Sequence, residues 1–146
     1  MGKIIDVEKL VIRDPEGNIR AYLGVESDGT TQLVFVGKTG HIRATLSVNE
    51  NDAPSLSLTD RGGLKRAGLA LSDKGVASLN FYDPSGKCRM TINVDPQGVP
   101  RVGMVDNSGI LRSLLTIYLD GTPTIQLFNT AGKPVFQAPE STAFVG

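Results

Sequence analysis

The sequence predicts an all-β protein: an antiparallel meander of six 23-residue repeats, each made of two strands. Three observations lead to this prediction. A residue pattern recurs every 23 positions without insertions, apolar residues occupy alternate positions within each repeat, and each repeat carries two turn motifs. Fixed-period repeats are typical of chains built from stacked supersecondary units, and alternation has the period of a β-strand.

The repeats keep the same residue type at several fixed positions. Their first residues are Leu10, Leu33, Leu56, Leu79, Val102 and Ile125. One column is always glycine: Gly17, Gly40, Gly63, Gly86, Gly109 and Gly132. This frame predicts a single repeat domain over 1–146, with an N-terminal cap at 1–9, six repeats at 10–139 and a C-terminal tail at 140–146.

Each repeat contains a short and a longer strand pattern. The short pattern is seen at 56–59 and 79–82, and the longer one at 44–48 and 90–94. Apolar residues occur at every second position, and no stretch has the spacing of an amphipathic helix. We therefore expect about twelve short strands and no helix.

The segments between the strands have the composition of tight turns. The first turn reads Asp-x-x-Gly, as in 83–86, and 95–98 repeats this chemistry in the second turn. Asp accepts nearby backbone N–H groups, Pro presets φ, and Gly tolerates positive φ. Strands joined by such short turns must be antiparallel, which argues against a parallel β-solenoid.

One face of the predicted sheet is strongly apolar. The sequence places 22 large apolar residues on it: Leu10, Ile12, Leu23, Val25, Leu33, Phe35, Leu46, Val48, Leu56, Leu58, Leu69, Leu71, Leu79, Phe81, Ile92, Val94, Val102, Met104, Leu115, Ile117, Ile125 and Leu127. Burying each is worth about 1.5–3 kcal/mol. A single sheet cannot cover its own face.

Three identical sheets with their apolar faces turned inward would form a homotrimeric β-prism, which is the arrangement we expect. A monomeric closed barrel, a sandwich or a trefoil-like arrangement of the six hairpins remain alternatives. Pro54, Pro100 and Pro123 share a column just after the second turn. Proline cannot donate to a strand ladder, so pairing should break or bend there.

The charge balance argues against strongly electrostatic partners. Lys plus Arg and Asp plus Glu each number 15, so the formal net charge is zero. Nucleic-acid binders and polybasic membrane binders usually carry a basic excess. The start of the chain has no secretory signal, and no apolar run is long enough to span a membrane. We expect a cytoplasmic protein or, alternatively, a component of a phage or injection-type particle.

Few residues have the chemistry of a catalytic or metal site. His41 is the only histidine and lies beside a turn glycine, which indicates a solvated turn residue. Cys88 is the only cysteine and shares a mostly apolar column, which predicts a buried, unreactive thiol. Asp-x-x-Gly supplies one oxygen where a calcium loop needs several. We expect no catalytic residue, cofactor or metal.

An arginine column is the strongest candidate site. Five of the six repeats contribute to it: Arg20, Arg43, Arg66, Arg89 and Arg112. It alternates with an apolar column and should therefore face away from the core. These arginines are expected to pair with carboxylates and keep the sheet soluble. They could otherwise form a groove for an anionic ligand or a stripe that pairs with another subunit.

The repeat pattern Leu-x-Leu-x-Asp-x-x-Gly-x-x-Arg-Ala-x-Leu-x-Val-x-x-x-Gly resembles a loose group of uncharacterised bacterial repeat proteins. The run at 132–139 is similar to the way such arrays end, and the resemblance extends from about Val7 to Pro139. The pattern is more distantly similar to β-rich phage and cell-surface fibre modules. The resemblance implies an architecture and no activity.

Together these observations predict a non-enzymatic structural protein that assembles with copies of itself, with a trimer favoured. The alternative is a binding module whose outer arginine row or turn loops recognise a glycan, a protein or another anionic partner. No nucleic acid or membrane is expected as a partner.

Overall fold

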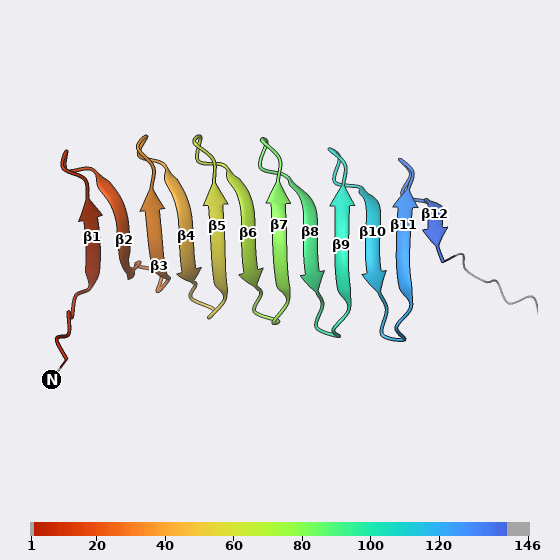
Figure 1. Ribbon diagram of the computed structural model, residues 1–146, viewed down its shortest axis with the longest axis horizontal. Helices are drawn as coiled ribbons and strands as arrows, with labels where there is room; N and C mark the ends of the chain where they lie inside the picture. The colour runs from red at the N-terminus through yellow and green to blue at the C-terminus, as the bar shows by residue number, and fades with distance from the viewer. Residues whose placement is uncertain (1, 140–146) are drawn as a thin grey trace, which may run out of the picture.

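The computed structural model describes residues 2–139, and the C-terminal tail expected at 140–146 lies outside them. The chain forms twelve strands that stand side by side in one long sheet (Figure 1). The strands are β1 (Lys9–Arg13), β2 (Ile19–Val25), β3 (Thr31–Val36), β4 (Ile42–Val48), β5 (Pro54–Thr59), β6 (Lys65–Leu71), β7 (Ala77–Tyr82), β8 (Cys88–Val94), β9 (Pro100–Val105), β10 (Leu111–Ile117), β11 (Pro123–Phe128) and β12 (Pro134–Ala138).

The sheet is an open antiparallel meander. The strand order follows the sequence from β1 to β12, and within the described residues strands contact only their neighbours in sequence. The predicted fold class is therefore confirmed, and a parallel solenoid is excluded. A closed barrel, a sandwich and a trefoil-like monomer are wrong, because β1 does not pair with β12 and the sheet does not fold back on itself.

The first turns of all six repeats and the second turns of the first five, which are the turns that the structure describes, have the same hydrogen bonding. In the first turn of repeat one, the Gly17 amide donates to the Asp14 carbonyl at 2.9 Å, and the Asp14 amide donates to the Asn18 carbonyl at 3.0 Å. Gly17 has a φ of 86°, in the region that favours glycine. The equivalent position in the second turn of repeat two is Asp52, which reaches a φ of 57°. The predicted turn chemistry is confirmed.

A β-bulge lies in the even-numbered strand of every repeat. In β4, Ile42 pairs with Val36 and Ala44 pairs with Phe35, so Arg43 has no partner opposite it on β3. The same register shift occurs in the other five hairpins. The arginine column therefore coincides with the extra residue of the bulge, and a bulge increases the local twist of its strand.

The proline column limits pairing, as predicted. Pro100 is the first residue of β9 and pairs with Val94 on β8. On its other side the ladder with β10 ends one residue later, at Arg101 and Thr116. Thr116 instead donates its hydroxyl to the Pro100 carbonyl at 2.9 Å.

The part of the chain that the structure describes has almost no conventional core. Between residues 2 and 139, the buried side chains are few: Ala21, Val34, Val99, Thr116 and Thr124. A folded domain of this size normally buries most of its large apolar residues. The chain alone therefore leaves its main apolar surface in contact with solvent.

The segment before β1 is extended and exposed. Residues 2–8 form no strand and lead away from the sheet (Figure 1). Ile4 is 89% exposed. Across residues 2–139 there is no helix that could cross a membrane.

Candidate interaction surface

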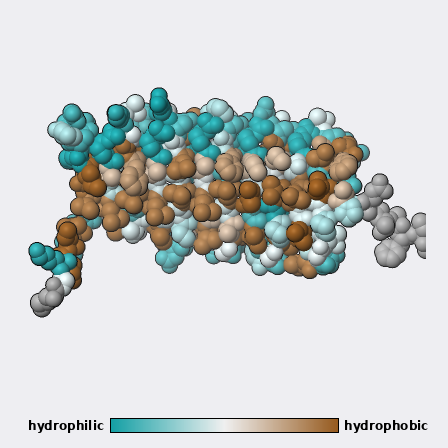
Figure 2. All heavy atoms as spheres, in the orientation of Figure 1, coloured by the Kyte–Doolittle hydropathy of each residue, from teal (hydrophilic) through white to brown (hydrophobic). Residues whose placement is uncertain are grey.

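The most prominent surface is the apolar face, defined as the 22 large apolar residues that the sequence places on one side of the sheet. The strand registers confirm this placement: Leu33 lies between Leu23 and Leu46, and this row continues across the sheet. Figure 2 shows a band of hydrophobic residues along the whole length of the molecule. Nineteen of the 22 residues are between 39% and 61% exposed.

This exposure is much larger than in an ordinary soluble monomer. The largest apolar patch on a typical monomer covers about 300–600 Å². Twelve strands spaced about 4.8 Å apart, each about 20 Å long, give a face on the order of 1,000 Å². Such a face is the size of one side of a stable protein–protein interface.

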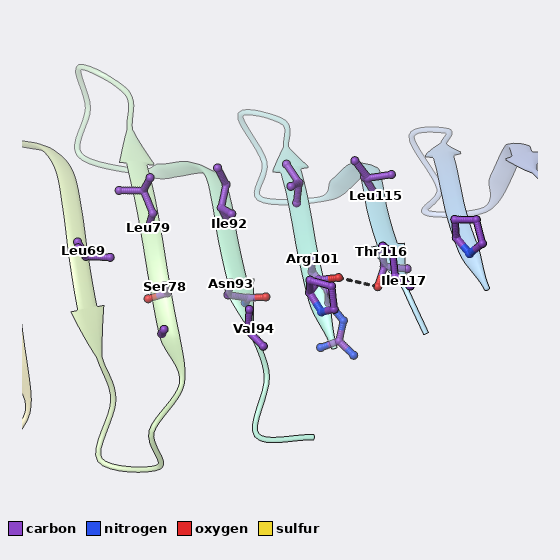
Figure 3. A pocket seen from close by; sticks show the side chains of 14 residues that line it. Leu69, Ser78, Leu79, Ile92, Asn93, Val94, Arg101, Leu115, Thr116 and Ile117 are labelled. Atoms are coloured by element: carbon purple, nitrogen blue, oxygen red, sulfur yellow. Dashed lines mark hydrogen bonds between the residues drawn. The ribbon is translucent and has the colours of Figure 1, made fainter. Parts of the chain in front are cut away.

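The apolar face is hollowed between β6 and β11. The hollow has a volume of about 470 Å³. Figure 3 shows Leu79, Ile92 and Leu115 among the side chains that line it. Ala77 and Pro100, which also line the hollow, are smaller than these neighbours and leave the space open. Sequence reasoning did not predict this hollow, although the Ala and Pro column that produces it is visible in the repeat.

The arginine column faces the other side of the sheet, and four of its five members bond to the next hairpin. Arg43 Nε donates to the Thr59 carbonyl at 2.9 Å, and Arg66 Nε donates to the Tyr82 carbonyl at 3.0 Å. Each bond crosses from an even strand to the last residue of the next strand. Arg89 and Arg112 make the equivalent contacts, with the carbonyls of Val105 and Phe128.

Three of these arginines also form ion pairs with the aspartate of their own first turn. Arg112 lies 2.6 Å from Asp106, Arg89 lies 3.4 Å from Asp83, and Arg66 lies 3.6 Å from Asp60. The Arg89 guanidinium also contacts the side chain of Asn107. Each of these three arginines thus has part of its set of donors engaged within the chain.

The turn aspartates act as hydrogen-bond acceptors for the backbone. Asp60 Oδ1 accepts from the amides of Gly62 and Leu64, at 2.9 and 3.1 Å. These bonds hold the pKa of Asp60 below its usual range, with a further contribution from Arg66. The pKa is lowered for the same main reason, a bond from a turn amide, at Asp28, Asp95, Asp106 and Asp120.

Asp83 has the strongest shift among these carboxylates. The Ser85 hydroxyl donates to Asp83 Oδ1 at 2.6 Å, and the amides of Ser85 and Lys87 donate to the same atom. These bonds and the Arg89 guanidinium lower the pKa of Asp83 to about 2. The carboxylate is therefore ionised at any physiological pH and serves the turn.

Cys88 and His41 lie outside any cluster of catalytic type. His41 is exposed beside a turn, as predicted. The prediction of a buried Cys88 is wrong, because its thiol is exposed. The bulge places Cys88 and Arg89 on the same, polar face, where the Cys88 Sγ lies 3.5 Å from the Thr91 hydroxyl. Residues 2–139 contain no group of three or more His, Cys, Asp or Glu that could hold a metal.

Comparison with known proteins adds no family assignment. No protein-family model matches the chain, and no curated protein shows significant similarity to it. The functional argument therefore depends on the geometry of the sheet itself.

Proposed function

We propose that this protein is a non-enzymatic structural scaffold that assembles through its apolar face against copies of itself. The observation that carries this proposal is the continuous apolar face, which nothing else within residues 2–139 covers. Half-exposed leucines such as Leu46 and Leu69 obtain only part of the free energy of burial. Contact with other copies would supply the remainder.

The size pattern across the apolar face supports a three-copy prism. The middle row, which includes Leu46, Leu56 and Leu69, is large on every strand from β1 to β11. The flanking row that includes Val48 and Pro54 alternates large and small residues. The other flanking row does so at Phe35–Ala44 but not at Phe81–Met90 or Leu127–Phe136. A triangular cross-section is widest at its axis and narrow at its corners, so it needs bulk in the middle row.

The width of the sheet fits the same arrangement. Three sheets, each about 20 Å wide, form a triangular tube whose axis lies about 6 Å from each backbone layer. Facing sheets pack about 10 Å apart, so each layer of side chains fills about 5 Å. The middle row would then meet at the axis without leaving a channel.

The arginine column supports the scaffold more than it supports an anion-binding module. Arg66, Arg89 and Arg112 are bound to carbonyls of the next hairpin and to carboxylates of their own turn. A glycan or another anion would have to compete with these bonds. In the scaffold, the same bonds hold successive repeats at a constant spacing.

A pair of substitutions on opposite faces of β4 tests the proposal. Leu46→Asp places a charge on the apolar face, while Ser47→Asp places the same charge one residue away on the opposite face, between Gln32 and Ser55. We expect Leu46→Asp to weaken self-association by at least about a hundredfold, because the carboxylate would be buried without a partner. Sedimentation equilibrium of both variants measures the effect.

The matched control separates an interface effect from a general loss of structure. Ser47→Asp should retain the native assembly, and circular dichroism should show strand content in both variants. Equal assembly of the two variants would contradict the proposal, because it would mean that the apolar face is not the contact surface.

A further inference from the structure

The two long rims of the sheet carry opposite charge, although the whole chain is neutral. All first turns lie along one rim and all second turns along the other (Figure 1). We define the first-turn rim as 13–20, 36–43, 59–66, 82–89, 105–112 and 128–135. The second-turn rim is defined by the equivalent segments 25–32, 48–55, 71–78, 94–101 and 117–124.

The charge difference between these rims is large. The first-turn rim holds eleven Lys and Arg and five Asp and Glu, so its formal charge is +6. The second-turn rim holds two Lys and Arg and seven Asp and Glu, so its formal charge is −5. The strands between them are about 20 Å long, well beyond the Debye length of about 8 Å at physiological salt. Each rim therefore presents its own sign to a partner.

Ion pairs within the rims do not remove this difference. Asp60 and Asp83 on the first-turn rim are paired with arginines of the same rim, which leaves Lys38, Arg61 and Lys87 in excess there. On the second-turn rim the one Arg–Asp pair joins Arg101 to Asp95 at 2.9 Å. The remaining carboxylates of that rim still outnumber its cations.

We infer that neighbouring copies meet rim to rim, with the first-turn rim of one chain against the second-turn rim of the next and all chains parallel. This inference rests on the proposed function, since it specifies how the apolar faces are brought together. In a parallel ring of three sheets, each corner joins a first-turn rim to a second-turn rim. Positive and negative rims are then in contact at all three corners.

The charge pattern also excludes the opposite orientation. In the opposite orientation, two sheets pack face to face and are related by a two-fold axis parallel to their strands. The first-turn rim of one sheet would then lie against the first-turn rim of the other. Two rims of +6 would then lie together, and like charges across an interface oppose association. The rim charges thus select the orientation, while the apolar face supplies the affinity.

Charge reversal at turn tips tests the inference. Lys38 and Arg61 occupy the second position of two first turns, and Glu50 and Asp73 occupy the second position of two second turns. One double variant carries Lys38→Glu and Arg61→Glu, the other carries Glu50→Lys and Asp73→Lys, and a fourfold variant combines all four. Circular dichroism confirms that each retains its strand content.

The fourfold variant restores opposite charge at the same positions, so it is the decisive chain. Sedimentation equilibrium at about 20 mM salt should show each double variant to be weakened on the order of tenfold. The fourfold variant should assemble within about threefold of the native chain. At about 0.5 M salt, where the charges are screened, all four chains should converge.

Each other outcome has a definite meaning. If the native chain assembles and both double variants assemble as strongly as the native chain, the inference is overturned and the proposed function stands. A fourfold variant that assembles more weakly than either double variant would also overturn the inference. Stronger assembly of the double variants than of the native chain would overturn it too, because it would indicate contact between like rims.

Loss of heparin binding by the Lys38→Glu and Arg61→Glu variant, with self-association unchanged, would instead assign the first-turn rim to a foreign polyanion. A native chain that stays monomeric would overturn both proposals.

Discussion

At the scale of single residues, the aspartate at the first position of a turn accepts hydrogen bonds from the turn's backbone amides, as the N-cap residue of a helix does. Asp95 accepts the amides of Gln97 and Val99, at 3.0 and 2.9 Å. Asn49 occupies the position equivalent to Asp95 in the second turn of repeat two and accepts in the same way from Asn51 and Ala53. Turns need this acceptor because their amides have no partner in the strand ladder.

Protonation of these carboxylates should weaken the fold, and Asp83 shows the direction most clearly. Its pKa is about 2 in the folded chain, against about 3.9 for an unfolded Asp. A lowered folded pKa adds stability that is fully present above pH 4 and is lost as the pH falls toward 2. We expect Asp83→Asn to lose less stability than the native chain between pH 5 and pH 2.5, measured as the urea midpoint at fixed protein concentration.

Asp6→Asn is the matched control for this measurement. Asp6 lies in the exposed segment before β1, outside both rims, and its substitution should leave the difference between the two pH values as in the native chain. If the Asp83→Asn and native profiles were parallel, the account of Asp83 as a turn acceptor with a lowered pKa would be wrong.

Residue chemistry was predictable for the turns but not for Cys88. The Asp and Gly of each turn follow from φ and hydrogen-bonding needs that act within five residues. Cys88 was placed with apolar neighbours in its column, whereas the bulge puts two successive side chains, those of Cys88 and Arg89, on the polar face. The bulge depends on strand pairing, which residue type alone does not reveal.

At the scale of elements, the unit is a hairpin with one bulge and one arginine bridge to the next hairpin. Arg66 illustrates the unit: it is the unpaired residue of β6, pairs with Asp60 in its own turn, and donates to Tyr82 at the end of β7. The bridge spans two adjacent strands at the point where the ladder is irregular. It therefore stabilises the contact between repeats.

Removal of this bridge should cost measurable stability. We expect Arg66→Met to lower the free energy of unfolding by about 1–2 kcal/mol, since it leaves a carbonyl without its charged donor while retaining the apolar stem. Lys3→Met, in the exposed segment before β1 and outside both rims, should change it by less than about 0.5 kcal/mol. Urea unfolding at one protein concentration compares them, and equal losses would contradict a bridging role for Arg66.

The strands were predictable almost to the residue, and the bulge was detectable in retrospect. The predicted strands 44–48 and 90–94 end where β4 and β8 end and begin two residues late. Matched leucines are 13 residues apart across the first turn, as in Leu33 to Leu46, but 10 apart across the second, as in Leu46 to Leu56. If both turns had equal geometry and both ladders were regular, the two spacings would be both even or both odd. The odd spacing across the first turn therefore requires one extra residue in that hairpin of each repeat, and this residue forms the bulge.

At the scale of the whole molecule, the chain forms an open sheet with one exposed apolar face, and we propose that other copies cover this face. The sequence could not decide between closure of one chain and assembly of several, because every strand carries the same pattern and all contacts between strands are local. The zero net charge conceals a basic rim and an acidic rim, which become visible only when the turns are assigned to the two sides of the sheet.

The mass of the native protein in solution tests the central claim most directly. Light scattering coupled to size exclusion, at micromolar concentration, should give about 46 kDa, three times the 15.5 kDa mass of the chain. This result would show that the apolar face is covered by two further copies. A stable, monodisperse species of 15.5 kDa would contradict the account, because the face that requires a partner would then remain exposed in solution.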